Sequence, residues 1–191
     1  MNGIAIECGA FDGITESSTY FFEKNMGWKC INIEASPPIF NILNQNRVNS
    51  FNFNLGLGNS TTELIFKHVV HPFHGEKFGN GSFSHKFNHL ELLQQENCRF
   101  DEYLICCDTY KNVIDKFMEK NFLGKEIDLF VLDVEGFENE VLFGMVGSKF
   151  LPKVMCVEFP HVGLENLKDV INTMGYNFDT IKDSNAFFIK K

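Results

Sequence analysis

Short apolar runs and amphipathic segments alternate along most of the chain. The runs that we interpret as strands occupy residues 3–8, 29–34, 50–55, 62–67, 102–107, 127–134 and 154–159. The run at 127–134 is apolar and ends in acids, which is typical of a central parallel strand buried on both faces. Because strands of this kind need helices to cover them, the intervening segments decide the class of fold.

Apolar residues at helical spacing predict helices between the strands. The predicted helices cover 15–26, 36–47, 108–118, 137–145 and 164–174. Thr15 is the expected N-cap of the first helix. Ser36 caps the second, followed by Pro37 at a position where a missing N–H has no cost. Gly175 ends the last helix. Residues 176–181 and 186–190 predict an antiparallel pair of strands joined by a turn.

The alternation predicts an α/β fold with a mostly parallel, doubly wound sheet, helices on both faces and a closing antiparallel strand pair. A length of 191 residues suits one domain over residues 1–191. Residues 68–97 show no clear periodicity and contain several glycines. Irregular stretches of this length are usually functional or mobile, so we expect a covering loop or lid there.

The charge balance narrows the class of partner. The formal net charge is −8 and no basic face is evident, which disfavours a nucleic-acid partner. No stretch reaches the roughly 18 apolar residues of a membrane span, and the first residues lack the pattern of a signal peptide, so we expect a cytoplasmic protein. In that compartment we expect all six cysteines to be reduced and structural.

A glycine-bearing turn follows the first strand and begins with an acid. The turn contains the residues Glu7, Cys8, Gly9, Ala10, Phe11, Asp12 and Gly13. Glycine lets the backbone approach a ligand closely, but this is not the GxGxxG pattern of dinucleotide sites. A carboxylate here repels pyrophosphate and suits a cationic ligand such as S-adenosylmethionine, which carries an ammonium and a sulfonium. The alternative is a plain tight turn.

Acids also lie at the ends of three other predicted strands: Glu34 ends 29–34, Asp133 and Glu135 lie at the end of 127–134, and Glu158 lies near the end of 154–159. Glu34 has the place and spacing of a carboxylate that accepts both ribose hydroxyls of a cofactor. Ligands of open α/β sheets bind beyond the carboxyl ends of the strands. We therefore expect these acids to share one crevice. The alternatives are a solvated Glu34 and an Asp133 that caps the following helix.

The histidines allow two further interpretations. His68, His71 and His74 are spaced three apart and could bind a metal, but Pro72 interrupts any helix, so we assign no metal ligand and favour a polar covering loop. His161 follows Glu158 by three residues and is either a general base or a histidine at the start of the next helix.

The sequence resembles the FkbM family of methyltransferases between Ile4 and Phe159. The similar segments are IECGAFDG, INIEASPPIF, NLGLGN, DTYKNVID, IDLFVLDVEGFENEVLFGM and VMCVEF, and the closing GYNFDTI and NAFFI fit the same fold. The D-V-E-G-x-E segment is the most specific. The resemblance implies a Rossmann-like class I methyltransferase fold with a mostly parallel seven-stranded sheet, binding of S-adenosylmethionine, and O-methylation of a sugar, glycan or small natural product.

By the resemblance, Glu7 and Gly9 lie by the methionine part of the cofactor and Glu34 holds the ribose. Asn54 lies near the adenine side, and Asp133 faces the methyl-transfer centre. Ala10, Phe11, Asp12, Gly13 and Ala35 complete the expected cofactor site. The sequence departs from the family at Phe11, where Asn is common, at Ala35, where Pro often follows the acid, and at Val131, where Lys commonly stands.

Methyl transfer to a hydroxyl requires positioning of the acceptor and removal of its proton. The candidate catalytic residues are Asp133, Glu135, Glu158 and His161. A divalent cation held by the acids is a second route to the same deprotonation. The competing functions are a nucleotide-binding oxidoreductase, which would need GxGxxG, and a catalytically inactive relative that binds the cofactor as a recognition module.

Overall fold

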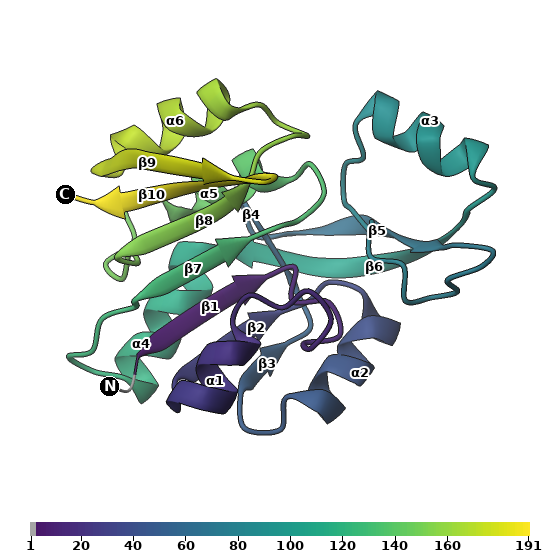
Figure 1. Ribbon diagram of the computed structural model, residues 1–191. Coiled ribbons are helices and arrows are strands. Elements are labelled where there is room, and N and C mark those ends of the chain that lie inside the picture. Colours follow the sequence, from purple (N-terminus) through teal and green to yellow (C-terminus); the bar gives the residue numbers. More distant parts are fainter. Residues whose placement is uncertain (1–2) are drawn as a thin grey trace.

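A seven-stranded sheet forms the centre of the computed structural model, which describes residues 3–191 (Figure 1). Its strands, in spatial order, are β3 Phe51–Phe53, β2 Lys29–Ile33, β1 Ile4–Cys8, β7 Leu129–Leu132, β8 Val154–Glu158, β10 Asn185–Lys190 and β9 Tyr176–Lys182. The first five are parallel, and β10 runs antiparallel to both β8 and β9. The predicted mostly parallel seven-stranded sheet with a closing antiparallel pair is confirmed.

Successive side chains of β1 point to opposite faces of the sheet, and both faces are covered by other parts of the chain. Ile4, Ile6 and Cys8 belong to the main core cluster, whereas Glu7 between them contacts the turn before α1. The helices are α1 Tyr20–Met26, α2 Pro37–Asn46, α3 Phe87–Gln95, α4 Lys116–Asn121, α5 Glu138–Met145 and α6 Leu164–Thr173, and a π-helical turn, Lys111–Asp115, precedes α4. The main core joins one face of the sheet to α4, α5 and α6. In Figure 1, α1 and α2 lie beside β1, β2 and β3.

A second sheet of three strands extends from the main one. It contains β4 Gly56–Gly58, β6 Arg99–Thr109 and β5 Thr62–Val70 in that spatial order, with β6 parallel to β4 and antiparallel to β5. The sequence predicted strands at 62–67 and 102–107 without placing them. Figure 1 shows β5 and β6 extending away from the main sheet, with α3 beyond their outer part.

The expectation that 68–97 is irregular was wrong in part. β5 continues to Val70 and α3 occupies Phe87–Gln95. Only His89 and Leu93 of α3 are buried, so its sequence carries a weak helical signal. The remaining residues form turns, and one of them returns to β5 through paired backbone hydrogen bonds between Lys67 and Ser82.

The first predicted helix is shorter than expected, and Thr15 does not cap it. Residues 11–19 form turns instead, because buried carboxylates hold the backbone there. Asp12 accepts hydrogen bonds from the amides of Ile14 and Thr15, and Glu7 accepts one from the amide of Ser18. The expected helix at Asp108 also starts later, at Lys111, because β6 continues to Thr109.

The structure also tests the expected start of the second helix and the expected role of the cysteines. Ser36 directly precedes α2 and Pro37 begins it, as predicted, although the Ser36 hydroxyl contacts His68 rather than the helix. All six cysteines are free, and Cys8, Cys30, Cys107 and Cys156 are buried, whereas Cys106 is exposed and Cys98 partly exposed; the expected structural role is therefore supported by burial for four of the six. Within residues 3–191, no helix has the length and apolar character to cross a membrane.

Candidate functional site

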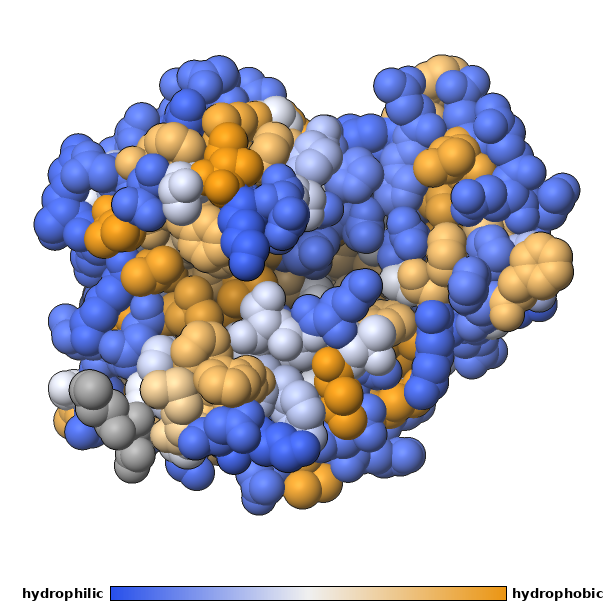
Figure 2. Space-filling view, in the orientation of Figure 1, coloured by the Kyte–Doolittle hydropathy of each residue, from blue (hydrophilic) through white to orange (hydrophobic). Residues whose placement is uncertain are grey.

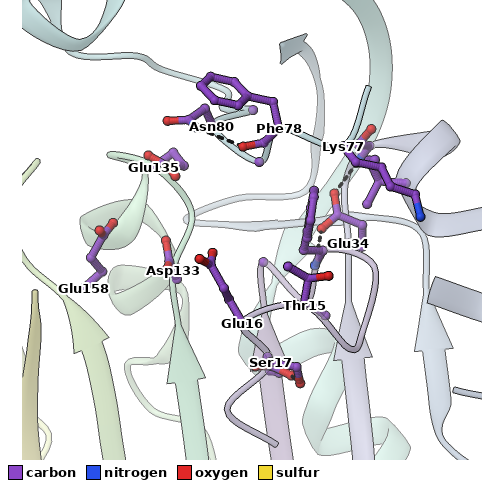
Figure 3. Close-up of a pocket in the computed structure, with 18 of the residues that line it drawn as sticks. Thr15, Glu16, Ser17, Glu34, Lys77, Phe78, Asn80, Asp133, Glu135 and Glu158 are labelled. Atoms are coloured by element: carbon purple, nitrogen blue, oxygen red, sulfur yellow. Dashed lines mark hydrogen bonds between the residues drawn. The ribbon is translucent and has the colours of Figure 1, made fainter. Parts of the chain in front are cut away.

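A cavity of about 580 Å³ lies where β1, β2, β7 and β8 end, and its size falls within the range of small-molecule sites. Figure 2 shows the molecule hollowed between the part that carries α6 and the part that carries α3. Figure 3 places Glu34 and Thr15 on one side of the pocket, Asp133, Glu135 and Glu158 on the other, and Phe78 and Asn80 across from the strand ends.

Gly9 allows the turn after β1 to pack against the end of β7. Its φ is 82°, and a Cβ atom at this position would lie 1.7 Å from the carbonyl oxygen of Asp133. The amides of Gly9 and Ala10 donate to the carbonyl of Ile33 at 3.0 and 3.1 Å, which fixes the turn over β2. Gly9, Ala10 and Phe11 therefore line the cavity, as the sequence predicted for this turn.

Glu34 directly follows β2 and is a buried acid that faces the cavity. Its carboxylate accepts hydrogen bonds from the Phe11 amide at 3.0 Å and the Ser36 amide at 2.7 Å, one on each oxygen. Burial raises the pKa of Glu34 to about 7, although these amides favour the charged form. Each carboxylate oxygen can accept a second hydrogen bond, so this group can still accept two hydroxyls of a ligand.

Glu7 is buried at the cavity wall and already has partners. It accepts from the Ser17 hydroxyl at 2.6 Å, the Ser18 amide at 2.8 Å and the Thr19 hydroxyl at 2.6 Å. Burial raises its pKa, and these hydrogen bonds and the charge of Arg47 oppose that rise. Glu7 therefore holds the turn that presents Ser17 and Ser18 to the cavity, in addition to lining it.

Three expected cofactor residues line neither the large cavity nor the smaller space beside it. Asp12 is buried against the amides of Ile14 and Thr15, and Gly13 packs beside Leu43 and Arg47. The amide group of Asn54 is exposed and donates to the carbonyls of Glu34 and Ala35. These residues shape the two loops that carry Phe11 and Glu34, but their side chains do not face this space.

Ala35 lines a smaller space of about 50 Å³ beside the main cavity. This space shares Gly9, Glu34 and Asp133 with the main cavity, and its other walls include Leu55, Leu57 and Phe83. Its largely apolar walls suit a flat, uncharged part of a ligand that is held at Glu34.

Asp133, at the end of β7, shares the other end of the cavity with Glu158. Burial first, and then the charge of Glu135, raises the pKa of Asp133 to about 7. Burial and the carboxylates of Asp133 and Glu135 raise the pKa of Glu158 to about 9. Neighbouring carboxylates disfavour each other's charge, so this pair retains a proton at neutral pH.

Asp133 does not cap the next helix. α5 begins at Glu138, and the carboxylate of Glu138 accepts hydrogen bonds from the amides of Val134 and Gly136. The loop after β7 is thus held by Glu138 and not by Asp133. The alternative of a purely capping Asp133 finds no support, and its side chain lines the cavity.

Glu135 and His161 form a pair next to these acids. The Nε2 atom of His161 lies 3.1 Å from Oε2 of Glu135 and 4.0 Å from Oε2 of Glu158. The hydrogen bond with Glu135 raises the pKa of His161. Glu135 lines the cavity and holds a φ of 55°, a conformation that is costly for residues other than glycine and is often found at functional sites.

The alternative that His68, His71 and His74 share one metal site finds no support. His68 contacts the Ser36 hydroxyl at 3.1 Å, whereas Nδ1 of His71 accepts the amides of Phe73 and His74. His68, in β5, and His74, in the segment after β5, both line the cavity.

The sequence prediction missed Glu16, Lys77, Phe78, Asn80 and the position of His89. Most of these belong to 68–97, where no periodic pattern was available to place them. Six lining residues are acids, against one lysine, Lys77; the acids are Glu7, Glu16, Glu34, Asp133, Glu135 and Glu158. This wall of the described structure favours a cationic ligand over a phosphate.

Residues 7–178 match the family model described as the methyltransferase FkbM domain. The chain belongs to the FkbM methyltransferase family. No curated protein sequence matches this FkbM chain.

Among solved structures, the FkbM methyltransferase from Methylobacillus flagellatus KT is similar, with 14% identity and a TM-score of 0.57. The match covers 98% of this chain and 43% of that one, so the chain spans less than half the length of that methyltransferase. A TehB-like SAM-dependent methyltransferase from Corynebacterium glutamicum ATCC 13032 Kitasato matches with 10% identity, a TM-score of 0.47, and coverage of 100% and 81%. The first likeness shows that the fold is that of class I methyltransferases.

The three positions at which the resemblance implied departures from the family pattern lie in or beside the cavity. Phe11 and Val131 line the large space and Ala35 lines the small one. Val131 gives the cavity an apolar lining residue in β7, two residues before Asp133. The departures therefore change the walls of the site and leave Glu34, Gly9 and Asp133 in place.

Proposed function

We propose that the protein is an S-adenosylmethionine-dependent O-methyltransferase that acts on a hydroxyl of a sugar, glycan or small natural product. The main support is Glu34, a buried carboxylate with acceptor capacity left on each oxygen, facing a cavity shared with the Gly9 turn. In this arrangement Glu34 accepts the ribose hydroxyls of the cofactor. The adenine lies toward the smaller apolar space, and the methionine part lies toward Glu7 and Ser17.

The acidic wall supports a sulfonium cofactor. S-adenosylmethionine carries two positive groups and one carboxylate, and the cavity offers several carboxyls to its positive groups. A carboxyl at Asp133 faces the space between the cofactor side and Glu158. Methyl transfer is an in-line displacement on an already activated carbon, so the protein mainly positions the acceptor oxygen.

Removal of the hydroxyl proton falls to the acids at the end of β7 and β8. Glu135 and His161 are paired with each other, whereas the carboxyls of Asp133 and Glu158 face the cavity. We assign Asp133 the role of orienting the acceptor hydroxyl and taking its proton, with Glu158 beside it. Residues 77–81 of the segment after β5 line the opposite wall, so acceptor specificity is assigned to them.

The test is replacement of Asp133 by Asn, which keeps the size of the side chain. Turnover, measured as transfer of a labelled methyl group to a panel of sugars and small hydroxylated compounds, should fall about 100-fold or more because the amide cannot act as a base. Cofactor affinity and melting temperature should change little. Asp179→Asn, at an exposed position of β9, is the matched control.

Two outcomes would contradict the proposal. Wild-type turnover in the Asp133→Asn variant removes the catalytic role of Asp133. Binding of S-adenosylmethionine without turnover on any hydroxyl compound favours instead the inactive relative that uses the cavity for recognition. Calorimetry that compares binding of S-adenosylmethionine with binding of nicotinamide dinucleotides separates the methyltransferase and the inactive relative from an oxidoreductase.

A further inference from the structure

Two histidines and one glutamate from separate parts of the chain meet beside the cavity. His89 belongs to α3, Glu135 to the loop after β7, and His161 to the loop after β8. Oε2 of Glu135 lies 3.1 Å from Nε2 of His161 and 3.7 Å from Nδ1 of His89. One ligand atom from each of the three residues falls within 4.8 Å of the others. The fold thus brings together residues that are far apart in sequence.

The hydrogen bonds of His89 show which of its nitrogen atoms carries the lone pair. Its Nε2 lies 3.0 Å from Oδ1 of Asn80, and the Asn80 amide nitrogen donates to the carbonyl of Phe78. Because the Asn80 nitrogen is used in that bond, Oδ1 is the atom facing His89, and Nε2 must donate to it. Neutral His89 then presents the lone pair of Nδ1 to Glu135.

This lone pair is buried without a partner. The His89 side chain is 7% exposed, and its Nδ1 atom has no hydrogen-bond partner in the described structure. A lone pair that faces a carboxylate oxygen is unfavourable in a buried place, since both atoms are electron-rich acceptors and neither can donate a hydrogen bond to the other. A cation between them would turn this arrangement into an attractive one.

We infer that His89, Glu135 and His161 form a binding site for a divalent first-row transition metal such as Zn²⁺. Metal–ligand bonds of about 2.0–2.2 Å place two ligand atoms of a tetrahedral ion about 3.4 Å apart. The distances from Oε2 of Glu135 to the nearest nitrogen atoms of His161 and His89, 3.1 and 3.7 Å, lie on either side of this value. Metal-binding histidines usually donate their other N–H to a fixed acceptor, as His89 does to Asn80. Two imidazoles and one carboxylate suit such ions better than Mg²⁺ or Ca²⁺, which prefer oxygen ligands.

Binding requires rotation of one ring. The rings of His89 and His161 are stacked 4.6 Å apart at 15° to each other, so their in-plane lone pairs do not yet converge. His161 has 22% of its side chain exposed and lies in a loop, so it has room to turn. Three protein ligands leave at least one coordination position open, and Glu135 connects the site to the cavity.

A second group, His71, Glu96 and Cys98, also places ligand atoms within 4.8 Å of one another. Here Nδ1 of His71 already accepts two amides, and Glu96 lies 4.0 Å from its Nε2 with 41% of its side chain exposed. In the described structure, no side-chain nitrogen or oxygen atom of this group is both buried and without a hydrogen-bond partner. It offers a matched control for the first site.

The experiment is metal titration of the chelator-treated protein without cofactor or acceptor. One Zn²⁺ per chain should bind in calorimetry, and Co²⁺ should give the visible absorption bands of a site with nitrogen and oxygen ligands. Glu135→Gln and His161→Ala should weaken binding at least about 10-fold, because even the loss of an outer hydrogen-bond partner commonly costs that much. Cys98→Ser should bind like the wild type, and Mg²⁺ should not compete.

The absence of Zn²⁺ binding, or equal binding by Glu135→Gln and His161→Ala, would overturn the inference and leave a simple ion pair between Glu135 and His161. Loss of binding in Cys98→Ser alone would assign the metal to the second group and also overturn it. Melting temperatures of each metal-free variant separate lost ligands from lost folding. The inference does not depend on methyl transfer: S-adenosylmethionine binding without metal binding would refute this site alone, and the reverse would refute only the proposed function.

Discussion

At the scale of single residues, burial of Glu34 makes the proposed cofactor binding dependent on pH. Its pKa is raised to about 7 by burial, so near neutral pH it exchanges between a charged and a neutral form. The charged form is the better acceptor for ribose hydroxyls. A ligand that prefers the charged form must bind more tightly as the pH rises through this pKa.

We expect the affinity for S-adenosylhomocysteine, which lacks the sulfonium charge, to rise about 10-fold between pH 6 and pH 8. Calorimetry at several pH values measures this rise. Glu34→Gln should lower the affinity about 10-fold or more at pH 8, as charged hydrogen bonds are lost, and should flatten the pH profile. Glu63→Gln, exposed on β5, is the control. An unchanged affinity in Glu34→Gln would remove Glu34 from the cofactor site.

Phe11 gives a prediction about stability at the same scale. Its φ is 48°, in the left-handed region that costs most side chains about 1–2 kcal/mol and that asparagine adopts readily. Phe11→Asn keeps the amide that donates to Glu34 and removes most of this strain. We expect the melting temperature to rise by about 2–4 °C. A fall in melting temperature would mean that packing of the half-buried ring outweighs the strain.

At the scale of elements, the segment after β5 is expected to be the part of the protein that closes over a bound ligand. Lys77, Phe78, Gly79, Asn80 and Gly81 line the cavity, and the segment is held to β5 by the paired backbone hydrogen bonds at Lys67. Such covering segments order when ligands bind.

Hydrogen exchange should therefore be faster in residues 71–86 than in β1 or β7 of the ligand-free protein. It should slow when S-adenosylhomocysteine and an acceptor are added. Peptides from β7 serve as the internal reference, because Phe130, Val131 and Leu132 are buried. Strong protection of residues 71–86 in the ligand-free protein would contradict a lid.

The local sequence pattern predicted those helices and strands whose buried residues recur at regular helical or strand spacing. The strands β1, β2, β7 and β8 and the helices α2, α5 and α6 were found close to their observed bounds. The three-stranded sheet was not predicted as a unit, because β4 pairs with β6 some fifty residues away in sequence. The shortening of α1 also depended on distant contacts, since Glu7 in β1 holds the turn before the helix.

The site was predictable to the extent that it follows the ends of strands. Glu34, Asp133 and Glu158 could be placed together because parallel strands end at one edge of a sheet. His89 could not be placed with Glu135 and His161, because α3 has few buried residues and follows an irregular segment. The sequence pattern also could not predict the contacts of Asn54, whose side-chain amide donates hydrogen bonds to the backbone carbonyls of Glu34 and Ala35.

At the scale of the whole molecule, the charge of the protein should affect the two forms of the cofactor differently. The chain has a formal net charge of −8, and its cavity wall is rich in acids. S-adenosylmethionine differs from its product by one positive charge at the sulfonium. The protein should therefore attract S-adenosylmethionine more strongly than S-adenosylhomocysteine, and dissolved salt should screen this attraction.

Raising the salt concentration from about 0.05 to about 0.5 M should weaken S-adenosylmethionine binding several-fold more than S-adenosylhomocysteine binding in metal-free protein. Parallel calorimetric titrations at fixed pH measure the two affinities. Equal salt dependence of both ligands would show that the acids of the cavity do not act on the sulfonium.

The position of β10 also sets an order of events during synthesis. β10 lies between β8 and β9, so β9 joins the main sheet only through a strand that the ribosome makes after it. Until residues 185–190 have left the ribosome, β8 has one free edge and the buried places of Ala186 and Phe188 are empty. A nascent chain that stops before Asn185 thus exposes a sheet edge to other chains, and chaperones should hold it until β10 is complete.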